Sequence, residues 1–361
     1  MLVVDGLIQE AAMTRRVENV TDARGAQEYN AAGRVVMPGF VDSHTHLLYP
    51  PPCPDGADPL RTLLATTGQR LARRGRGYLE AMVRHGTTTV EAKTGCGLNE
   101  SAETKVLRAL GTLHQNPIDV IPTFLFRLPP QGDPTAAESV FTELMPLLQR
   151  RRLAQFADLQ WEDDSARYPL FTRYLEVARE LGFACKIHAD QAGPAAIAAA
   201  VEYSVVSVDH LEQVTPDQAR MLANSSTMAT LLPFTSFREG RQSSARTLID
   251  AGAAVALGTD YNPAGAPSLN MQTALALACR NHGMTAAEAI SAATINSAHA
   301  VGCGDRVGML AYRKSADLLI LNASDYRDLP QQFGTNLVHA AMKRGVFLYE
   351  EASVAGNPHV P

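Results

Sequence analysis

Five residues whose side chains can bind a metal ion or move a proton stand far apart in the chain, each after an apolar run. His44 and His46 end "GFVDSHTH", His188 follows "CKI", His210 follows "SVD" and Asp260 follows "ALGT". Imidazole nitrogens combined with one carboxylate suit zinc or ferrous iron and leave a position open for water. The sequence therefore predicts a divalent metal site with four protein ligands: His44, His46, His188 and Asp260. His210 remains as a group that can give or take a proton near neutral pH.

This prediction depends on several strand ends and not on any one histidine. An H-x-H pair alone is as typical of ordinary loop histidines as of ligands, and a buried histidine bonded to a backbone carbonyl is the usual structural alternative. In a β-strand, however, residues i and i+2 share a face, so His44 and His46 are expected to point the same way. Four predicted strands end in such residues, at the edge where barrel enzymes place their active sites, which argues against the structural alternative.

The elements that must position these residues alternate along the chain. Segments with helical spacing, such as residues 100–116, 172–182, 215–225 and 243–252, separate short apolar or β-branched runs. Strand and helix alternating eight times predict a parallel sheet closed into a (β/α)8 TIM-type barrel. An open doubly wound sheet is the alternative, but no G-x-G-x-x-G follows the first strand. The eight predicted strands are residues 34–41, 86–92, 118–125, 154–160, 183–189, 204–210, 226–232 and 254–260.

The two ends of the chain differ from its middle. Residues 1–36 and 309–361 read as short strands and turns, and barrel termini lie near each other, so the two ends can pair. We therefore expect a discontinuous small β-sandwich domain from residues 1–36 and 309–361, with residues 37–308 forming the catalytic barrel.

Composition excludes several classes of function. Apolar residues make up 46% and charged residues 19% of the 361-residue chain, which is typical of a globular protein. A formal net charge of -5 and the lack of a long basic run argue against nucleic acid as the main partner. Five cysteines without a C-x-x-C pair favour a reduced compartment, and we see no secretion signal or membrane span. The expected location is the cytoplasm.

Six stretches in a fixed order carry a resemblance to a known family. They are "PGFVDSHTH", "VEAKTGCGLNESAETKVLRAL", "KIHADQ", "VDHLE", "ATLLP" and "LGTDYNPAGAPS", and "KSADLLIL" follows the barrel. Over most of residues 35–335 the chain resembles the amidohydrolase superfamily and, within it, the imidazolonepropionases. The resemblance implies one metal ion, zinc or iron, on the four ligands already named, and it favours a homodimer.

The resemblance also implies a reaction. Water attacks a ring carbonyl, Asp260 passes the proton of the water to the leaving nitrogen, and protonated His210 stabilises the oxyanion, so that a cyclic amide C–N bond opens. Gln191 stands where related deaminases carry an acidic proton shuttle, and as a glutamine it is expected to hold the substrate instead. Lys93 lies on strand two and not on strand four, so we interpret it as structural or substrate-facing.

Where the chain departs from this family, its substrate is less well defined. "KTGCGL" places Cys96 where the family usually has a substrate-contacting tyrosine, and "TFLFRLPP" places Leu128 where it has a histidine. Arg61 or Arg127 can replace the arginine that pairs with the substrate carboxylate, although such side chains are mostly just solvated. The leading substrate is 4-imidazolone-5-propanoate, converted to N-formimidoyl-L-glutamate. The alternatives are a heterocycle aminohydrolase that releases ammonia and a non-catalytic ligand-binding homologue.

Overall fold

Eight parallel strands form one sheet whose spatial order follows the chain from β4 to β11. The computed structural model describes residues 1–50, 58–96, 99–128, 134–189, 194–211, 213–241, 244–263 and 265–351. The strands are β4 (Phe40–Asp42), β5 (Thr87–Lys93), β6 (Asp119–Phe126), β7 (Phe156–Gln160), β8 (Ala184–His188), β9 (Ser207–Asp209), β10 (Met228–Leu231) and β11 (Val255–Leu257). Each of the eight predicted runs overlaps one of them, with β4, β5 and β6 each ending one residue beyond the run, and the predicted α/β barrel is confirmed.

The first and last strands meet just beyond their carboxyl ends. The backbone N–H of Asp260 donates to the carbonyl of His44 over 2.9 Å, and that of His46 donates to the carbonyl of Tyr261 over 2.8 Å. A glycine permits this approach, because a Cβ atom at Gly258 would lie 2.8 Å from the Cβ of His44. The barrel therefore closes through the same residues that the sequence predicts as metal ligands.

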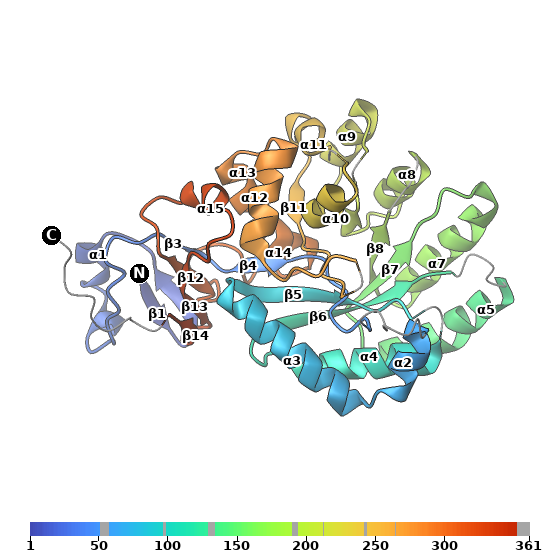
Figure 1. The fold of residues 1–361 in the computed structure, drawn as a ribbon, viewed down its shortest axis with the longest axis horizontal. Coiled ribbons are helices and arrows are strands. Elements are labelled where there is room, and N and C mark those ends of the chain that lie inside the picture. The colour runs from blue at the N-terminus through green and yellow to red at the C-terminus, as the bar shows by residue number, and fades with distance from the viewer. Residues whose placement is uncertain are drawn as a thin grey trace.

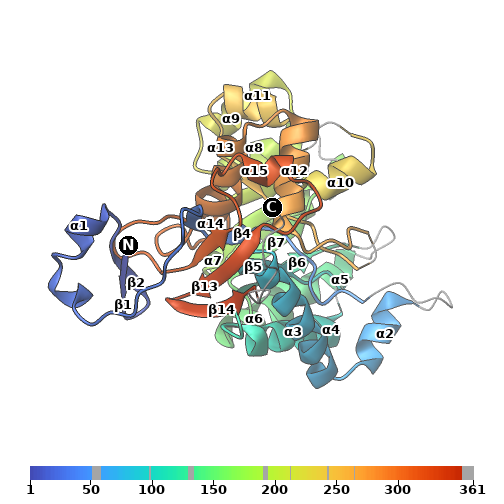
Figure 2. The same cartoon turned by 60° about the vertical axis from the view of Figure 1, so that its left-hand side comes forward.

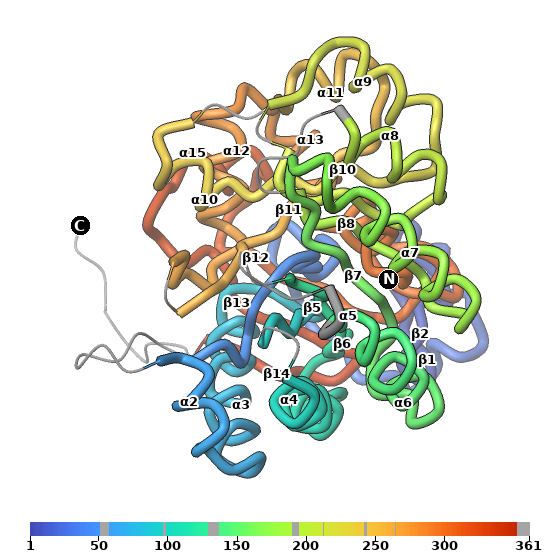
Figure 3. The backbone as a smooth tube through the Cα atoms, turned by 90° about the vertical axis from the view of Figure 1, so that its right-hand side faces the viewer, coloured from blue at the N-terminus to red at the C-terminus, as the bar shows by residue number. Residues whose placement is uncertain are grey.

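Helices follow the strands and surround them (Figures 1 and 3). Their starts agree with the capping rules, as in α4, where the side chain of Asn99 accepts the N–H of Ala102, and in α9, where Thr215 and Gln218 form a capping box. The helical segments between β4 and β8 are α2 (Pro59–Ala65), α3 (Gly68–Arg84), α4 (Glu100–Leu113), α5 (Pro134–Ser139), η2 (Val140–Leu144), α6 (Met145–Arg150), η3 (Ser165–Arg167) and α7 (Tyr168–Glu180). Those after β8 are α8 (Pro194–Glu202), α9 (Pro216–Ala223), α10 (Pro233–Arg238), α11 (Ala245–Asp250), α12 (Met271–His282), α13 (Ala286–Ser291), η4 (Ala292–Asn296) and α14 (Ser297–Ala300).

Both ends of the chain contribute antiparallel strands at one side of the barrel (Figures 1 and 2). β1 (Leu2–Val4) pairs with β2 (Leu7–Glu10), and a four-stranded sheet has the order β14 (Val346–Glu350), β13 (Val338–Lys343), β12 (Leu318–Leu321) and β3 (Val36–Pro38). The short helical segments α1 (Thr14–Val17), η1 (Thr21–Ala23) and α15 (Asp328–Gln331) complete these ends. The boundaries of a separate β-sandwich domain, residues 1–36 and 309–361, stay a prediction.

The first predicted strand is divided between the two sheets. β3 pairs with β12 in the small sheet, and β4 pairs with β5 in the barrel. Only Gly39 separates β3 from β4 along the chain. A Cβ atom at Gly39 would lie 2.4 Å from the side chain of Thr88, so glycine is required where the chain passes from one sheet into the other. The sequence did not reveal this division, because no polar side chain interrupts the run from residue 35 to 41.

Buried ion pairs join the small sheet to the amino-terminal end of the barrel. Lys343, at the end of β13, places its Nζ 2.9 Å from Asp119 of β6 and 2.6 Å from Asp317. Asp119 begins its strand, so this contact lies at the end of the barrel opposite the strand-end histidines. Among the described residues no helix combines the length and the apolar character needed to cross a membrane.

Candidate active site

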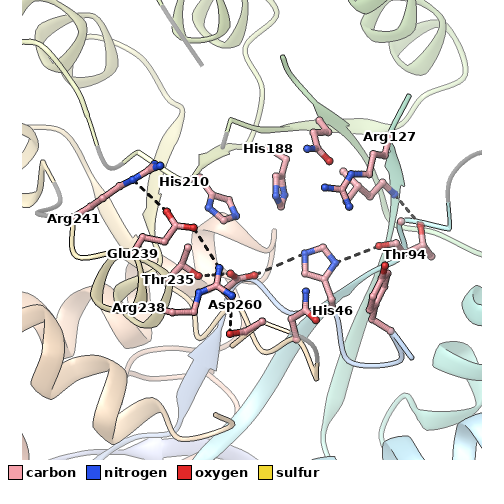
Figure 4. Close-up of a pocket in the computed structure, with 16 residues that line it drawn as sticks. His46, Thr94, Arg127, His188, His210, Thr235, Arg238, Glu239, Arg241 and Asp260 are labelled. Atoms are coloured by element: carbon pink, nitrogen blue, oxygen red, sulfur yellow. Dashed lines mark hydrogen bonds and ion pairs between the residues drawn. The ribbon is translucent and has the colours of Figure 1, made fainter. Parts of the chain in front are cut away.

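The five predicted residues come together at the carboxyl ends of β4, β8, β9 and β11. Figure 4 shows four of them: His46, His188, His210 and Asp260. Ring centroids of His188 and His210 are 4.3 Å apart, and those of His44 and His188 are 4.8 Å apart. The Oδ1 atom of Asp260 lies 3.7 Å from the Nε2 of His44 and 3.9 Å from the Nε2 of His46. All five side chains are buried or nearly so, with relative exposures of 9% or less.

Two of the histidines have one ring nitrogen fixed by a neighbour. The Nδ1 of His44 donates to Oδ2 of Asp209 over 2.7 Å, and the Nδ1 of His46 donates to the carbonyl of Thr94 over 3.3 Å. These bonds leave each Nε2 as an acceptor turned towards Asp260. The buried Nε2 of His44 has no hydrogen-bond partner among the described residues. An orphaned nitrogen facing further imidazoles and a carboxylate fits a divalent metal ion, and groups of three such donors lie within 4.8 Å of one another.

His210 and Asp260 have an unusual backbone conformation. Their φ angles are 66° and 52°, in the left-handed region that residues other than glycine rarely adopt. His210 stands directly after β9 and Asp260 three residues after β11, where the chain turns away from the strand while the side chain faces the site. Such conformations carry a conformational cost and cluster at functional sites, so they favour a functional role for both residues.

Burial and nearby charge keep the imidazoles of His44 and His46 neutral. Burial lowers the pKa of both rings well below the usual range, and the cation of Lys93 lowers the pKa of each further. Deprotonated imidazole is the form that binds a metal ion. The charge state of the two rings therefore agrees with the predicted metal site.

Two carboxylates at the strand ends are held by threonine hydroxyls. Thr235 donates its hydroxyl to Oδ2 of Asp260, which leaves Oδ1 facing the histidines. Asp42 of β4 accepts the hydroxyl of Thr259 over 2.6 Å and its backbone N–H over 2.9 Å. Burial nevertheless raises the pKa of Asp42 to about 7. Asp42 thus ties the segment after β11 to β4, while Asp260 faces the site.

A cavity of about 350 Å³ opens above these residues. Arg127, one of the predicted substrate-binding residues, lines it and is exposed, so its guanidinium is accessible to an anion. Cys96 does not line it, although the preceding Thr94 and Gly95 do; its backbone N–H donates to Glu103 over 2.7 Å. Arg61 lies exposed on α2 and is also absent from the lining, and Gln191 lies outside the described residues.

Part of the cavity wall was not predicted from the sequence. Arg238, Glu239 and Arg241, at the end of α10 and after it, line the cavity, and Glu239 lies between the two arginines at 3.3 Å from each (Figure 4). The available signal was their place in "PFTSFREGR", directly after the seventh predicted strand. Residues that follow barrel strands reach the active-site face, so the rule that selected His188 applies to this segment also.

Comparison with known proteins shows the family to which this chain belongs. The model of the Amidohydrolase family matches residues 35–348. An imidazolonepropionase of Porphyromonas gingivalis is 36% identical to this chain over 97% of the chain and 89% of the relative. An imidazolonepropionase of Bacillus cytotoxicus is 35% identical over 94% of the chain and 88% of the relative.

The fold has solved counterparts at lower identity. A 5-methylcytosine deaminase from Klebsiella pneumoniae, solved with phosphonocytosine, superimposes with a TM-score of 0.76 at 18% identity, covering 99% of this chain and 96% of that one. At this identity the likeness concerns the fold alone. The family model spans the barrel and nearly all of the four-stranded sheet, and the resemblance drawn from the sequence motifs is confirmed. The chain belongs to the amidohydrolase family.

Proposed function

We propose that this protein is a metal-dependent hydrolase that opens a cyclic amide C–N bond, with 4-imidazolone-5-propanoate as substrate and N-formimidoyl-L-glutamate as product. The observation that carries the proposal is the convergence of three imidazoles and one carboxylate around the orphaned Nε2 of His44. Relatives named imidazolonepropionase, about 35% identical over nearly the whole chain, supply the substrate.

One zinc or iron ion is the proposed cofactor. Its proposed ligands are His44, His46, His188 and Asp260, whose nitrogen and oxygen donors suit either metal. When bound, such an ion lowers the pKa of coordinated water towards ~7 and polarises a carbonyl. The neutral state of His44 and His46 supports this assignment, because protonated rings would repel a cation.

The chain's own residues then move protons and orient the substrate. Asp260 takes one proton from the attacking water and delivers it to the ring nitrogen as the C–N bond breaks. The carbonyl carbon gains the water oxygen and becomes a carboxylic acid, which releases its remaining proton to solvent as the carboxylate. His210 donates a hydrogen bond to the oxyanion that forms in between. The bond from Thr235 holds Oδ2 of Asp260 and so keeps its Oδ1 directed at His44 and His46.

Arg127 is the proposed partner of the substrate's propanoate group. It lines the cavity, and among the described residues no carboxylate pairs with it, whereas Arg238 and Arg241 each contact Glu239. An unpaired guanidinium binds a carboxylate through two parallel hydrogen bonds. Gln191, Cys96 and Arg61 stay sequence-based candidates for substrate contacts, with Cys96 and Arg61 placed outside the cavity lining.

Substrate conversion tests this function directly. Purified protein loaded separately with zinc and with iron should consume imidazolone propanoate and yield the formimidoyl product, followed by absorbance and mass spectrometry. Loss of the metal by chelation should abolish the reaction, and Arg127→Gln should raise KM with little change in kcat. Ammonia release from purines, pyrimidines or triazines, without imidazolone opening, would instead identify a heterocycle aminohydrolase. Metal binding without hydrolysis of any tested substrate would identify a non-catalytic homologue.

A cytoplasmic location and a homodimer are part of the same proposal. The location follows from the scattered cysteines and the dimer from the family resemblance. Fractionation of the native host and light scattering of the purified protein test them.

A further inference from the structure

The interior of the barrel below the metal site is filled with charges. Barrels usually fill this space with branched apolar side chains. Here the inward-facing positions of neighbouring strands carry two lysines and three carboxylates, each with no exposed side-chain surface: Glu91, Lys93, Asp158, Lys186 and Asp209. Burying so many charges costs several kcal/mol per ion unless each one is paired closely. Because apolar side chains would fill the same space without this desolvation cost, we expect these charges to have a role in the site.

Contacts in this cluster form a continuous path to a proposed metal ligand. The Nζ of Lys93 lies 2.7 Å from Oδ2 of Asp158 and 3.0 Å from Oδ2 of Asp209. That same oxygen of Asp209 accepts the Nδ1–H of His44 over 2.7 Å. The other oxygen of Asp209 accepts the hydroxyl of Ser207, also over 2.7 Å. Both oxygens of Asp209 are therefore fixed, and Lys93 holds the one that orients His44.

We infer that Lys93 is a positioning residue of the metal site, which acts through Asp209 to fix the tautomer and direction of His44. This inference rests on the metal site of the proposed function and assigns a role to a lysine whose ion pairs, among the described residues, are with Glu91, Asp158 and Asp209. With Lys93 in place, Asp209 stays a hydrogen-bond acceptor, His44 keeps its proton on Nδ1, and Nε2 stays available to the metal. Such outer partners of metal-bound histidines are worth about 10- to 100-fold in metal affinity.

The second buried lysine provides a matched comparison. Lys186 is equally buried and contacts Oε2 of Glu91 over 2.5 Å, but among the described residues it makes no ion pair with Asp209. Removing either lysine deletes one buried cation of the same size from the same cluster. A purely structural role predicts that both losses act alike, through stability. A positioning role predicts that only the loss of Lys93 acts on the metal.

The experiment measures zinc affinity of the full-length apoprotein by competition with a chelating dye, together with its thermal unfolding. Lys93→Met should raise the zinc dissociation constant about 10- to 100-fold. Lys186→Met should change it less than about threefold, even if it lowers the unfolding temperature as much. Equal zinc affinity of Lys93→Met and wild-type protein would overturn the inference, and so would equal losses in the two lysine variants.

A double-variant cycle separates the proposed path from a general loss of structure. Because Lys93 acts through Asp209, the variant with both Lys93→Met and Asp209→Asn should bind zinc no more weakly than Asp209→Asn alone. Fully additive losses would overturn the path. If Lys93→Met does not fold, Asp158→Asn decides, since Asp158 anchors Lys93 from its other side. It should weaken zinc binding severalfold, and unchanged affinity would contradict the inference.

The outcome is distinguishable from failure of the proposed function. If wild-type protein binds zinc but does not convert imidazolone propanoate, the proposed substrate is wrong. The zinc affinities of the variants then still decide the role of Lys93. Wild-type protein that binds no divalent metal would overturn both.

Discussion

At the scale of single residues, the site is built from side chains that use one polar atom for orientation and leave the other for chemistry. His44 uses Nδ1 on Asp209, His46 uses Nδ1 on Thr94, and Asp260 accepts the hydroxyl of Thr235. Fixing one atom of each group removes the rotamers that would turn the other away, so part of the entropy cost of binding is met in advance.

The hydroxyl of Thr235 provides a test at this scale. Thr235→Val keeps the shape of the side chain but removes the donor, and a hydrogen bond to a charged group is worth about 1.5 to 3 kcal/mol. We expect kcat to fall about 10- to 100-fold, because Asp260 loses the bond that orients it. KM should stay nearly unchanged, because the contacts of the substrate are kept. Thr235→Ser should keep kcat within about threefold of wild type. A valine variant with wild-type kcat would contradict this role.

At the scale of elements, strand ends and the backbones behind them decide where the ligands lie. β4 and β11 approach closely enough to exchange backbone hydrogen bonds at His44, His46 and Asp260. This close approach requires glycine at position 258, because any side chain there would collide with His44. The helix after β5 contributes as well, because Glu103 of α4 accepts the backbone N–H of Cys96 and so holds the loop that lines the cavity.

Gly258→Ala tests the close approach of the two strands. The added methyl group would lie 2.8 Å from the Cβ of His44 and 2.9 Å from its backbone nitrogen, which must shift. Overpacking of this kind costs about 1 to 3 kcal/mol, so the urea midpoint should fall and zinc binding should weaken. Gly111→Ala, at an exposed position of α4 where nothing lies within 4 Å of the added Cβ, is the control and should stabilise by about 0.5 to 1 kcal/mol. The same response in both variants would refute the packing explanation.

The buried carboxyl of Glu103 predicts a pH dependence of stability. Burial raises its pKa to about 7 from an ordinary value of 4.5. The folded protein therefore binds this proton more tightly than the unfolded chain, and its contribution to stability is lost as pH rises from about 4.5 through about 7. Between pH 5 and pH 8 wild-type protein should lose roughly 2 to 3 kcal/mol more than Glu103→Gln, measured by urea unfolding. Parallel pH profiles of the two proteins would show that Glu103 does not titrate in this way.

At the scale of the whole molecule, the two ends of the barrel have different tasks. The carboxyl ends of the strands carry the site, and the amino-terminal end is joined to the four-stranded sheet through Lys343, Asp119 and Asp317. In barrel enzymes the carboxyl ends of the strands carry the catalytic residues, and the amino-terminal end contributes to stability. The small sheet therefore braces the barrel without reaching the cavity.

Asp119→Ala should separate stability from activity. It leaves the buried cation of Lys343 with one carboxylate in place of two, and breaking a buried pair costs about 3 kcal/mol. The unfolding temperature should fall by several degrees, whereas kcat/KM at 25 °C should stay within about twofold of wild type. Asp217→Ala, which breaks an exposed pair with Arg220, is the control and should change neither quantity. A large loss of kcat/KM in Asp119→Ala would mean that the small sheet also controls the site.

The sequence by itself determined the eight strands, the barrel and the five residues at the strand ends. Each of these signals is local, since a buried strand reads as an apolar run and the polar residue that ends it follows directly. Comparison with the family motifs named Arg127 and Arg61 as candidates for the substrate carboxylate, and of these two Arg127 lines the cavity.

Only the tertiary structure decided how these residues are held and what shares their cavity. Lys93, Asp158 and Asp209 are separated by dozens of residues, and no periodicity along the chain pairs them. The passage of the first run from one sheet to another at Gly39, and the facing of Arg238, Glu239 and Arg241 into the cavity, likewise depend on distant neighbours. Contacts between strands far apart in sequence are fixed by barrel closure, which brings His44, just after β4, against Asp260, just after β11, because all eight strands lie side by side in one sheet.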